Sequence, residues 1–473
     1  ADEDVISARG RRSDPKFKPD FNLDLLRSIP YMGEFCLVKR DALKKVGGFQ
    51  PYTNYESHDI ALRIYEQYGE TAIGHIPDVL FHSPSASRRS KEDRILIDVV
   101  QDHLERSGIE AKVAVGYLPE TTRATYSHPS TPKVSIVIPS RDKLEFFQPC
   151  IESLIKKTEY PDYEIIVVDH QSEDPDALAY YDTLVDKYSD KVRLLRYEGE
   201  FNFSAMMNFA FQSAQGEYFL MLNNDTEILH TDWLSRMMDY AQRSDVGVVG
   251  ARLVKPETGH LQHAGLLLGL GDIAGSPYQD VLDIKEPGYM GRAQVDQNYS
   301  AVSAACLLIS SEVYQAVGGM NEDDFHCSFS DVDLCLRVKA SGQRIVWTPY
   351  TTLIHHGSKT HNSEASRLGG AATKPKRMEY EREKMLEKWL PQLSSDPAYN
   401  PNLSLVRKDY RIEVNMPRNW DTHFHDRSRV LGLPLDGGSG DYRVIHPLEA
   451  LSKAGLAQTE YYRFAKGALR KIG

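Results

Sequence analysis

The sequence predicts an α/β fold in which an open, mainly parallel sheet is followed by a half with mixed strand directions. Strand and helix patterns alternate from residue 133 to 255, and this alternation is typical of parallel sheets. From about 250 to 360 the pattern becomes mixed, with glycines and histidines among apolar runs. Part of that second half recurs near the start of the chain, which predicts a partial second copy of the same fold.

The elements of the parallel half follow one another in a regular order. Each predicted strand is a mainly apolar segment of four to five residues, and predicted helices separate most of them. The strands are expected at 134–138, 164–168, 192–196, 218–222 and 246–249, and helices at 144–155, 203–215 and 232–242. Ligands of open α/β sheets gather at the carboxyl ends of such strands.

Composition bounds the class of protein. The chain has 473 residues, 41% hydrophobic and 26% charged, which predicts a globular protein of two or three domains. Lys and Arg total 56 and Asp and Glu total 67, so the net charge of -11 disfavours nucleic acid as the main partner.

Cysteine usage and apolar run length indicate the compartment. The five cysteines form no CxxC pair and lie mostly in apolar runs, as expected of reduced thiols in a cytoplasmic protein. No run approaches the roughly 20 apolar residues of a transmembrane helix, and the start has no signal-peptide pattern. A peripheral position at the inner face of the plasma membrane stays open. The chain begins inside what looks like a motif, so we expect it to be part of a longer polypeptide.

Polar residues follow three strands of the parallel half. Pro139, Ser140 and Arg141 follow the first strand, and Asp169 ends the second. Asn223-Asn224-Asp225 ends the strand at 218–222. Asp169 has the alternative of capping the next helix, and an Asn-Asn-Asp run also suits a turn.

Two polar motifs follow in the second half. In Ser330-Asp-Val-Asp333 a helix would separate the carboxylates of Asp331 and Asp333 by about 200°, so they cannot share one role. Asp333 and Arg337 are spaced for a structural ion pair within that helix. His355 and His356 end a strand and therefore point to opposite faces, so one of them at most reaches a common site.

These segments, in this order, resemble the inverting family 2 glycosyltransferases with the GT-A fold. The resemblance implies that Asp331 is the catalytic base and that Asp225 and a histidine, His355 in preference to His356, hold Mn²⁺ or Mg²⁺ on a donor diphosphate. It also implies that Asp169 binds a pyrimidine ring, hence a UDP- or dTDP-sugar donor. The chain departs from the family in having one carboxylate in Asn-Asn-Asp and Ser330 in place of a glutamate.

The same resemblance fixes the wider expectations for the site. The acceptor is expected to be a saccharide or lipid-linked saccharide hydroxyl, and the context to be bacterial surface polysaccharide such as O-antigen, with hexosyl or rhamnosyl transfer. The donor-binding residues are expected to be Pro139, Ser140, Arg141, Asp169, Asn208, Asn223, Asn224 and Asp225.

An internal repeat links the first residues to the second half. The segment 35–49 parallels 305–320, and Asp59-Ile-Ala-Leu-Arg63 parallels Asp333-Leu-Cys-Leu-Arg337. Asp2-Glu-Asp4 is expected to correspond to Asn223-Asn-Asp225. The first copy has Ser57 where the second has Asp331, so it is expected to be non-catalytic.

These patterns predict five segments. They are a partial, non-catalytic copy (1–105), a linker (106–132), a complete GT-A domain (133–362), a helical flank and linker (363–428), and a strand, glycine loop and helix (429–473). The last segment resembles the start of a GT-B-like transferase domain, and its glycine loop has the alternative of being a structural turn.

Two other functions compete with sugar transfer. A sugar-nucleotide pyrophosphorylase would carry a glycine-rich, basic phosphate loop after the first strand, where this chain has Pro-Ser-Arg-Asp. A non-catalytic carbohydrate-binding or scaffold protein built from decayed transferase copies fits Ser57, but not the intact series of polar residues in the second copy. Hydrolysis of a donor would separate an enzyme from a scaffold.

Overall fold

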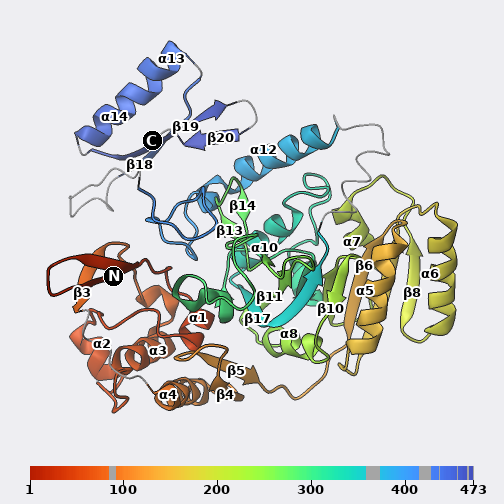
Figure 1. The fold of residues 1–473 in the computed structure, drawn as a ribbon, viewed down its shortest axis with the longest axis horizontal. Coiled ribbons are helices and arrows are strands. Elements are labelled where there is room, and N and C mark those ends of the chain that lie inside the picture. Colours follow the sequence, from red (N-terminus) through yellow and green to blue (C-terminus); the bar gives the residue numbers. More distant parts are fainter. Residues whose placement is uncertain are drawn as a thin grey trace. The chain divides into compact units, whose positions relative to one another are not determined.

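A computed structural model describes residues 1–84, 92–357, 373–414, 428–435, 437–454, 456–465 and 468–471 (Figure 1). The chain forms two compact units, residues 1–410 and 411–473. The predicted boundary at 362 and most of the predicted linker after 414 lie outside the described residues. Among the helices of the described ranges, none is long and apolar enough to cross a bilayer.

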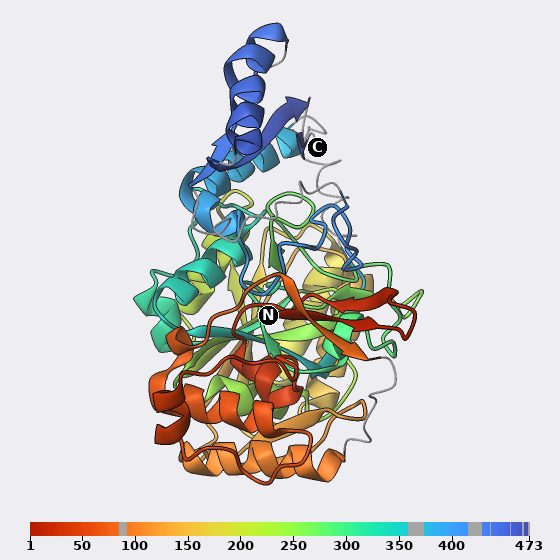
Figure 2. The ribbon, with the colours of Figure 1, turned by 90° about the vertical axis from the view of Figure 1, so that its left-hand side faces the viewer.

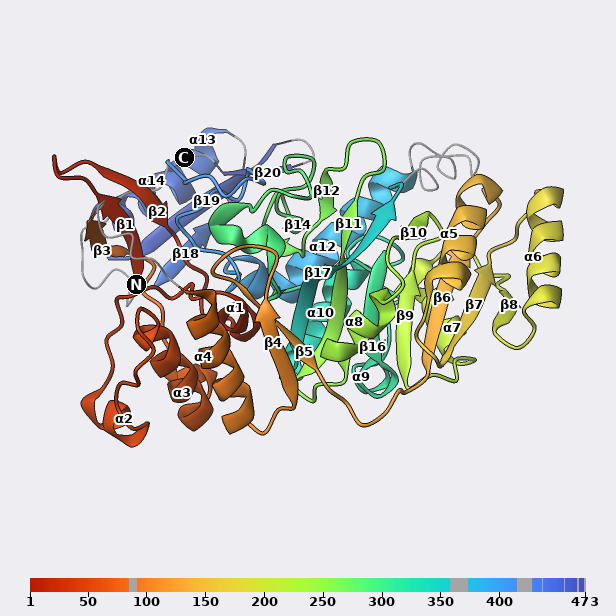
Figure 3. The ribbon, with the colours of Figure 1, turned by 60° about the horizontal axis from the view of Figure 1, so that its bottom comes forward.

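The first unit is built on a ten-stranded sheet with a parallel half and a mixed half (Figure 3). The parallel half has the order β9-β6-β7-β8, and helices connect its strands along the chain. The elements are β6 (Val134–Ser140), α5 (Leu144–Lys157), β7 (Tyr163–Asp169), α6 (Pro175–Lys187), β8 (Val192–Arg196), α7 (Phe203–Phe211) and β9 (Tyr218–Leu222). The predicted α/β class is thereby confirmed.

The mixed half continues the sheet in the order β9-β16-β11-β17-β10. The elements of this half follow one another in the chain from β10 to α12. They are β10 (Thr226–Ile228), α8 (Trp233–Ala241), β11 (Val246–Val254), β12 (Leu261–His263), β13 (Leu267–Leu268), β14 (Ala274–Gly275), the 3₁₀ helix Tyr289–Gln294, β15 (Gln297–Asn298), β16 (Cys306–Ser310), α9 (Ser311–Ala316), α10 (Ser330–Ala340), β17 (Arg344–His355) and α12 (Thr373–Leu393).

One strand takes a different place from the one the sequence indicates. We expected the strand at 246–249 to continue the parallel half directly. Instead β16 lies antiparallel between β9 and β11. The apolar pattern gives a strand's existence, whereas its neighbours depend on pairing with a segment some 60 residues later in the chain.

Both faces of the sheet are buried, and strand β7 makes this clear. Ile165 and Val167 belong to one apolar cluster, and Ile166 and Val168 belong to the other. Successive strand residues point to opposite faces, so a shift of one residue would move each of these side chains into the wrong layer. The register also places Asp169 at the carboxyl end of β7, opposite Ser140 of β6.

Residues 1–132 belong to the same compact unit, and their helices gather at one end of it (Figure 2, red to orange). The segment predicted as a linker, 106–132, holds a β-hairpin. The elements are β1 (Asp2–Ile6), β2 (Arg12–Lys16), α1 (Leu23–Ser28), α2 (Arg40–Lys45), α3 (Glu56–Tyr68), the 3₁₀ helix Glu70–Ala72, β3 (Val79–Pro84), α4 (Asp93–Arg106), β4 (Ala111–Val115) and β5 (Thr122–Tyr126).

A buried ion pair joins this N-terminal part to the main sheet. Arg243, just after α8, donates to the carboxylate of Asp24 on α1, and both side chains are almost fully buried. The Arg243 guanidinium also lies over the ring of Tyr126, 4.9 Å from its centroid. A buried charge of this kind needs its partner, so the first 132 residues are a packed part of the unit.

Helix α3 of the first predicted copy and helix α10 of the second make similar contacts. Arg63 pairs with Asp59 on α3 as Arg337 pairs with Asp333 on α10. In both copies the arginine also donates to the carbonyl of the valine that precedes a Gly-Gly pair. These shared contacts support the internal repeat, which stays a proposal.

The strands of the two copies differ. β1 runs parallel to β3, whereas β10 runs antiparallel to β17. The predicted equivalence of Asp2-Glu-Asp4 with Asn223-Asn-Asp225 therefore does not extend to strand direction. Even so, Asp4 pairs with His82 as Asp225 pairs with His355.

The carboxyl group of Asp296 predicts a pH dependence of stability. It is buried beside Tyr240, whose hydroxyl donates to it at 2.6 Å, and burial raises the pKa of Asp296 to about 7. The folded protein therefore retains a proton that the unfolded chain releases near pH 4, so this group's contribution to stability falls as the pH rises from about 4 through 7.

We expect Asp296→Asn to remove this dependence. The unfolding free energy of the wild type should fall by on the order of 2 kcal/mol more than that of the variant between pH 5 and 8. Urea unfolding at the two pH values measures it, and parallel pH curves for the two proteins would contradict the assignment.

The second unit is a small strand–helix–strand arrangement. β18 (Arg429–Gly432) pairs in parallel with β19 (Gln458–Ala465), and β20 (Ala468–Lys471) pairs antiparallel with β19. Between the parallel strands lie the glycine turn at Gly438–Gly440, a π-helical turn (Asp441–Ile445) and α14 (His446–Lys453). The elements follow the predicted order of strand, glycine loop and helix, and the GT-B-like assignment stays a prediction.

Candidate functional site

The first cluster of the candidate site forms where β9 ends and β10 pairs with β17. Thr226 stands opposite His355 in that pairing, which brings the imidazole beside the preceding turn. Nε2 of His355 lies 3.1 Å from Oδ1 of Asp225 and 3.3 Å from the amide nitrogen of Asn223. Residues 130 positions apart in the chain thus meet at one strand end.

The carboxylate of Asp225 is ionised in this cluster. Burial by itself would raise the pKa of Asp225, but the hydrogen bond and charge of His355 outweigh burial and lower it. Nδ1 of His355 is buried and has no hydrogen-bond partner within the described part of the chain. An ionised carboxylate and a nearby imidazole are suited to a divalent cation.

The protein supplies few ligands of its own for such a cation. Within the described ranges, no group of three or more His, Cys, Asp or Glu side chains is arranged to hold a metal ion. Asp225 and His355 therefore fit a metal only as part of a shell that a bound diphosphate and water complete.

His356 faces away from this cluster. Its Nε2 lies 2.7 Å from Oε1 of Glu227, and its ring packs near Phe146, with centroids 5.5 Å apart. The two adjacent histidines thus point to opposite faces, and His355 is the one beside Asp225.

Asp331 lies in the first turn of α10, which begins after Phe329 in a left-handed conformation. Its Oδ2 accepts a hydrogen bond from the backbone N–H of Ala304 at 3.1 Å. Burial of its carboxyl group raises the pKa of Asp331 despite this and other backbone hydrogen bonds. A carboxylate of raised pKa that stays partly exposed is suited to accept a proton.

The loop at residues 303–305 connects the two clusters. The backbone N–H of Asn223 donates to the carbonyl of Ala305 at 3.1 Å, and Ala304 donates to Asp331. One short loop thus contacts the turn that carries Asp225 and the residue predicted to be the base.

His263 is a site neighbour that the sequence did not reveal. His263 is buried on β12, and its Nε2 accepts the backbone N–H of Ser303 at 3.3 Å. Burial, with the nearby charge of His355, lowers its pKa to about 3. A neutral imidazole thus supports the connecting loop, and only the strand pairing places it there.

The predicted donor residues of the first two strands lie at neighbouring strand ends. Asp169 is buried, its Oδ2 accepts from Arg196 at 3.0 Å, and its Oδ1 accepts the backbone N–H of Ser172 at 3.1 Å. The hydroxyl of Ser140 lies 2.9 Å from that of Tyr181 and 3.4 Å from the side-chain nitrogen of Asn224.

Three further predicted donor residues have different surroundings. Pro139 lies within β6 opposite Val168, and the guanidinium of Arg141 lies 4.0 Å from Glu173. Asn208 on α7 is engaged elsewhere. Its amide oxygen accepts from Tyr314 and from a backbone N–H, and its amide nitrogen donates to Glu322. The structure therefore places Asn208 as a support of the turn after α9, apart from the strand ends.

Asp333 is fully buried on the far side of α10 from Asp331. Arg337 donates to its Oδ2 at 2.7 Å, the i,i+4 pair expected from the spacing. Its Oδ1 accepts from Lys388 at 2.7 Å and from the indole of Trp389 at 2.9 Å, both on α12. These contacts give Asp333 a structural role.

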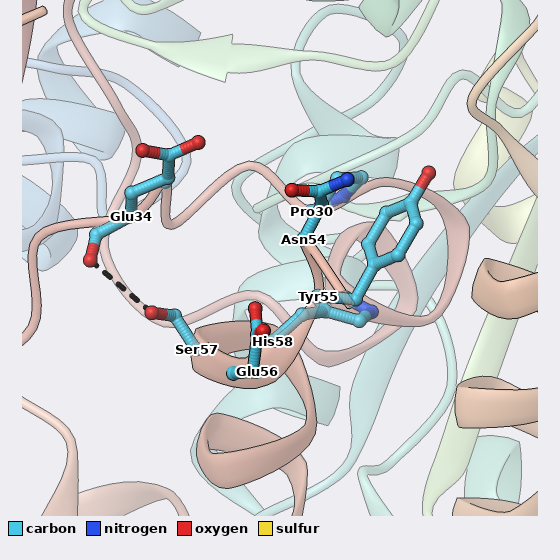
Figure 4. A pocket seen from close by; sticks show the side chains of 8 residues that line it. Pro30, Glu34, Asn54, Tyr55, Glu56, Ser57 and His58 are labelled. Atoms are coloured by element: carbon cyan, nitrogen blue, oxygen red, sulfur yellow. Dashed lines mark hydrogen bonds between the residues drawn. The ribbon is translucent and has the colours of Figure 1, made fainter. Parts of the chain in front are cut away.

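The N-terminal part has a small pocket at the position that the proposed repeat would make equivalent to the Asp331 site (Figure 4). Its volume is about 130 Å³, and its lining includes Glu34, Glu56 and Ser57. The hydroxyl of Ser57 donates to the backbone carbonyl of Glu34 at 3.1 Å, so it is used structurally. A hydroxyl here does not replace a carboxylate as a proton acceptor.

Comparison with known proteins identifies the family of the main domain. The family model described as "Glycosyl transferase family 2" matches residues 135–316. The uncharacterized protein y4gI of Sinorhizobium fredii is 39% identical over 421 residues, or 86% of this chain and 45% of that protein. The O-antigen biosynthesis protein RfbC of Myxococcus xanthus is 36% identical over 422 residues, or 86% of this chain and 31% of that protein.

The chain thus spans less than half of the length of these curated relatives. Among solved structures, GalNAc-T7 with UDP, GalNAc and Mn²⁺ is similar with a TM-score of 0.42 and 13% identity, over 56% of this chain and 50% of that one. The resemblance read from the motifs is confirmed by the family match, which lies at residues 135–316, within the domain built on the central sheet.

Proposed function

We propose that residues 133–362 catalyse transfer of a sugar from a nucleoside diphosphate donor to a saccharide hydroxyl, with inversion at the anomeric carbon. The single observation that supports it most is the connection of Asp225, His355 and Asp331 through the loop at 303–305. This arrangement puts an ionised carboxylate for a diphosphate-bound cation close to a carboxylate suited to be a base.

In the proposed reaction Asp331 accepts the proton of the acceptor hydroxyl as its oxygen bonds to the anomeric carbon. The bond from that carbon to the diphosphate oxygen breaks, and the leaving diphosphate takes the electron pair. Attack from the face opposite the leaving group inverts the anomeric centre. The raised pKa of Asp331 favours its role as proton acceptor.

Asp225 and His355 would hold Mn²⁺ or Mg²⁺, with Asn223 beside them. A divalent ion there would neutralise charge on the leaving diphosphate. The low pKa of Asp225 favours this role because the carboxylate is ionised at neutral pH.

The donor is proposed to be a UDP- or dTDP-sugar. Asp169 is buried at a strand end, where it would accept the N3–H of a pyrimidine ring, and Ser140 and Asn224 lie between it and Asp225. Arg196 already donates to one oxygen of Asp169, so a base would use the remaining acceptor positions of that carboxylate.

In its parent protein the domain is proposed to act in the synthesis of a bacterial surface polysaccharide, on a saccharide or lipid-linked saccharide. The relative named for O-antigen biosynthesis supports this context. A cytoplasmic location is consistent with the five free thiols, and a peripheral position at the inner face of the plasma membrane is proposed only from the context of surface polysaccharide synthesis. The N-terminal copy is proposed to be non-catalytic because Ser57 stands in place of a base.

The test is an assay of donor turnover with UDP- and dTDP-linked hexoses and rhamnose, with Mn²⁺ and short saccharide acceptors. Transfer to an acceptor, with the anomeric configuration of the product opposite to that of the donor by NMR, is the expected result. Retained configuration would contradict the single-displacement mechanism. Complete lack of donor hydrolysis and transfer would favour the scaffold alternative.

A further inference from the structure

We propose that helix α12, through Glu381, is the element that positions the base Asp331. The inference rests on the proposed function and assigns a role to a segment that the sequence indicated only as a flank. Figures 1 and 3 show α12 alongside α10, the helix that carries Asp331.

Glu381 supports the turn that leads into α10. Its side chain is fully buried, although a glutamate is rarely so without partners. Oε1 accepts the backbone N–H groups of His326 at 2.9 Å and Cys327 at 3.2 Å, and Oε2 accepts that of Ser328 at 2.8 Å. One carboxylate thus binds three consecutive amides just before Asp331.

The three amides bound by Glu381 lie directly before the helical turn that carries Asp331, so their position affects the orientation of that side chain. The chain passes from Ser328 through Phe329, which has a positive φ of 60°, directly into the turn that carries Asp331. A change in residues 326–328 would therefore rotate the start of α10. A misplacement of about 1 Å at a catalytic group can cost on the order of 100-fold in rate.

A second contact prevents α10 from moving independently of α12. Lys388 and Trp389 donate to Asp333 from positions seven and eight residues after Glu381, two turns along α12 and on the same side. α12 therefore holds α10 at the turn before Asp331 and again at Asp333, two residues after it.

The contact of Glu381 lies next to the position where this chain departs from the family motif. Ser330 stands where family members usually have a glutamate, and its hydroxyl donates to the carbonyl of Cys327 at 3.2 Å. The buried carboxylate beside this turn is instead supplied by Glu381, about 50 residues later. We infer that α12 provides the positioning that Ser330 cannot.

The test compares Glu381→Gln with Glu387→Gln as a matched control. Glu387 lies on the same helix but is exposed and pairs only with Lys384 among the described residues. In Glu381→Gln an amide N–H₂ replaces one acceptor oxygen and faces backbone donors. We expect kcat to fall about 10- to 100-fold with little change in the Kd for UDP and Mn²⁺, and we expect the acidic limb of the kcat–pH profile to move. Glu387→Gln should match the wild type.

Hydrogen exchange separates failure of this inference from failure of the proposed function. Faster amide exchange at residues 326–332 in Glu381→Gln, but not in Glu387→Gln, is expected whether or not activity is found. If Glu381→Gln does not fold, Lys388→Met removes the ammonium group that donates to Asp333 and lies over the rings of Phe325 and Trp389, while Arg337 and Trp389 still donate to Asp333. This variant is expected to give a smaller fall in kcat. Wild-type exchange and kcat in folded Glu381→Gln would overturn the proposal, as would a parallel loss of nucleotide binding. An inactive wild type would instead refute the proposed function.

Discussion

Replacement Asp331→Asn is expected to lower the rate of sugar transfer about 10²- to 10⁴-fold while the protein still folds and binds the donor nucleotide. Asparagine keeps the shape of the side chain and can still accept the N–H of Ala304, but it cannot take a proton from the acceptor. Initial rates at saturating donor and acceptor, with the melting temperature as a check on folding, measure the effect.

The matched control is Asp323→Asn, an exposed carboxylate in the loop before α10. It should leave the rate unchanged. An Asp331→Asn variant with more than a tenth of the wild-type rate would show that another group accepts the proton. A variant that loses nucleotide binding as well would point to a structural role for Asp331.

Asp225→Ala and His355→Ala are expected to abolish binding of Mn²⁺ in the presence of UDP, and transfer with it. Within the described ranges, these two side chains are the only strong protein ligands brought together at this strand end. Diphosphate and water would complete the coordination shell of the cation, so removal of either side chain should greatly weaken metal binding. Electron paramagnetic resonance of free Mn²⁺, titrated with protein and UDP, reports the bound fraction.

The adjacent histidine provides the control for this experiment. His356 faces Glu227, so His356→Ala should retain Mn²⁺ binding with UDP. Equal losses in His355→Ala and His356→Ala would contradict the assignment of His355, and unchanged binding in Asp225→Ala would remove the proposed metal site.

Local patterns predict much of this fold because each strand and helix of the parallel half carries its own signal. The strand at 164–168 and the polar residues at strand ends could be predicted for that reason, whereas the assignment of its side chains to two apolar clusters comes from the structure. The insertion of β16 between β9 and β11 was not, since apolar runs such as Cys306–Ser310 do not encode their neighbours.

The same distinction applies to the site. Asp225, Asp331 and His355 could be named as candidates because their motifs come in a known order, and their roles stay predictions. His263 and Glu381 could not, because a lone histidine and one glutamate in a charged helix carry no local signal, and their contacts arise only from packing. For Asn208 the sequence predicted donor binding, whereas the structure shows its side chain hydrogen-bonded to Tyr314 and to the turn after α9.

The most direct test of the central claim is calorimetric titration of the protein with UDP and dTDP, each with and without Mn²⁺, and with GDP as a comparison. The proposed site predicts that a pyrimidine nucleotide binds only when Mn²⁺ is present, and that GDP binds more weakly. Absence of binding by UDP and dTDP under both conditions would contradict the assignment of residues 133–362 as a nucleotide-sugar-dependent transferase.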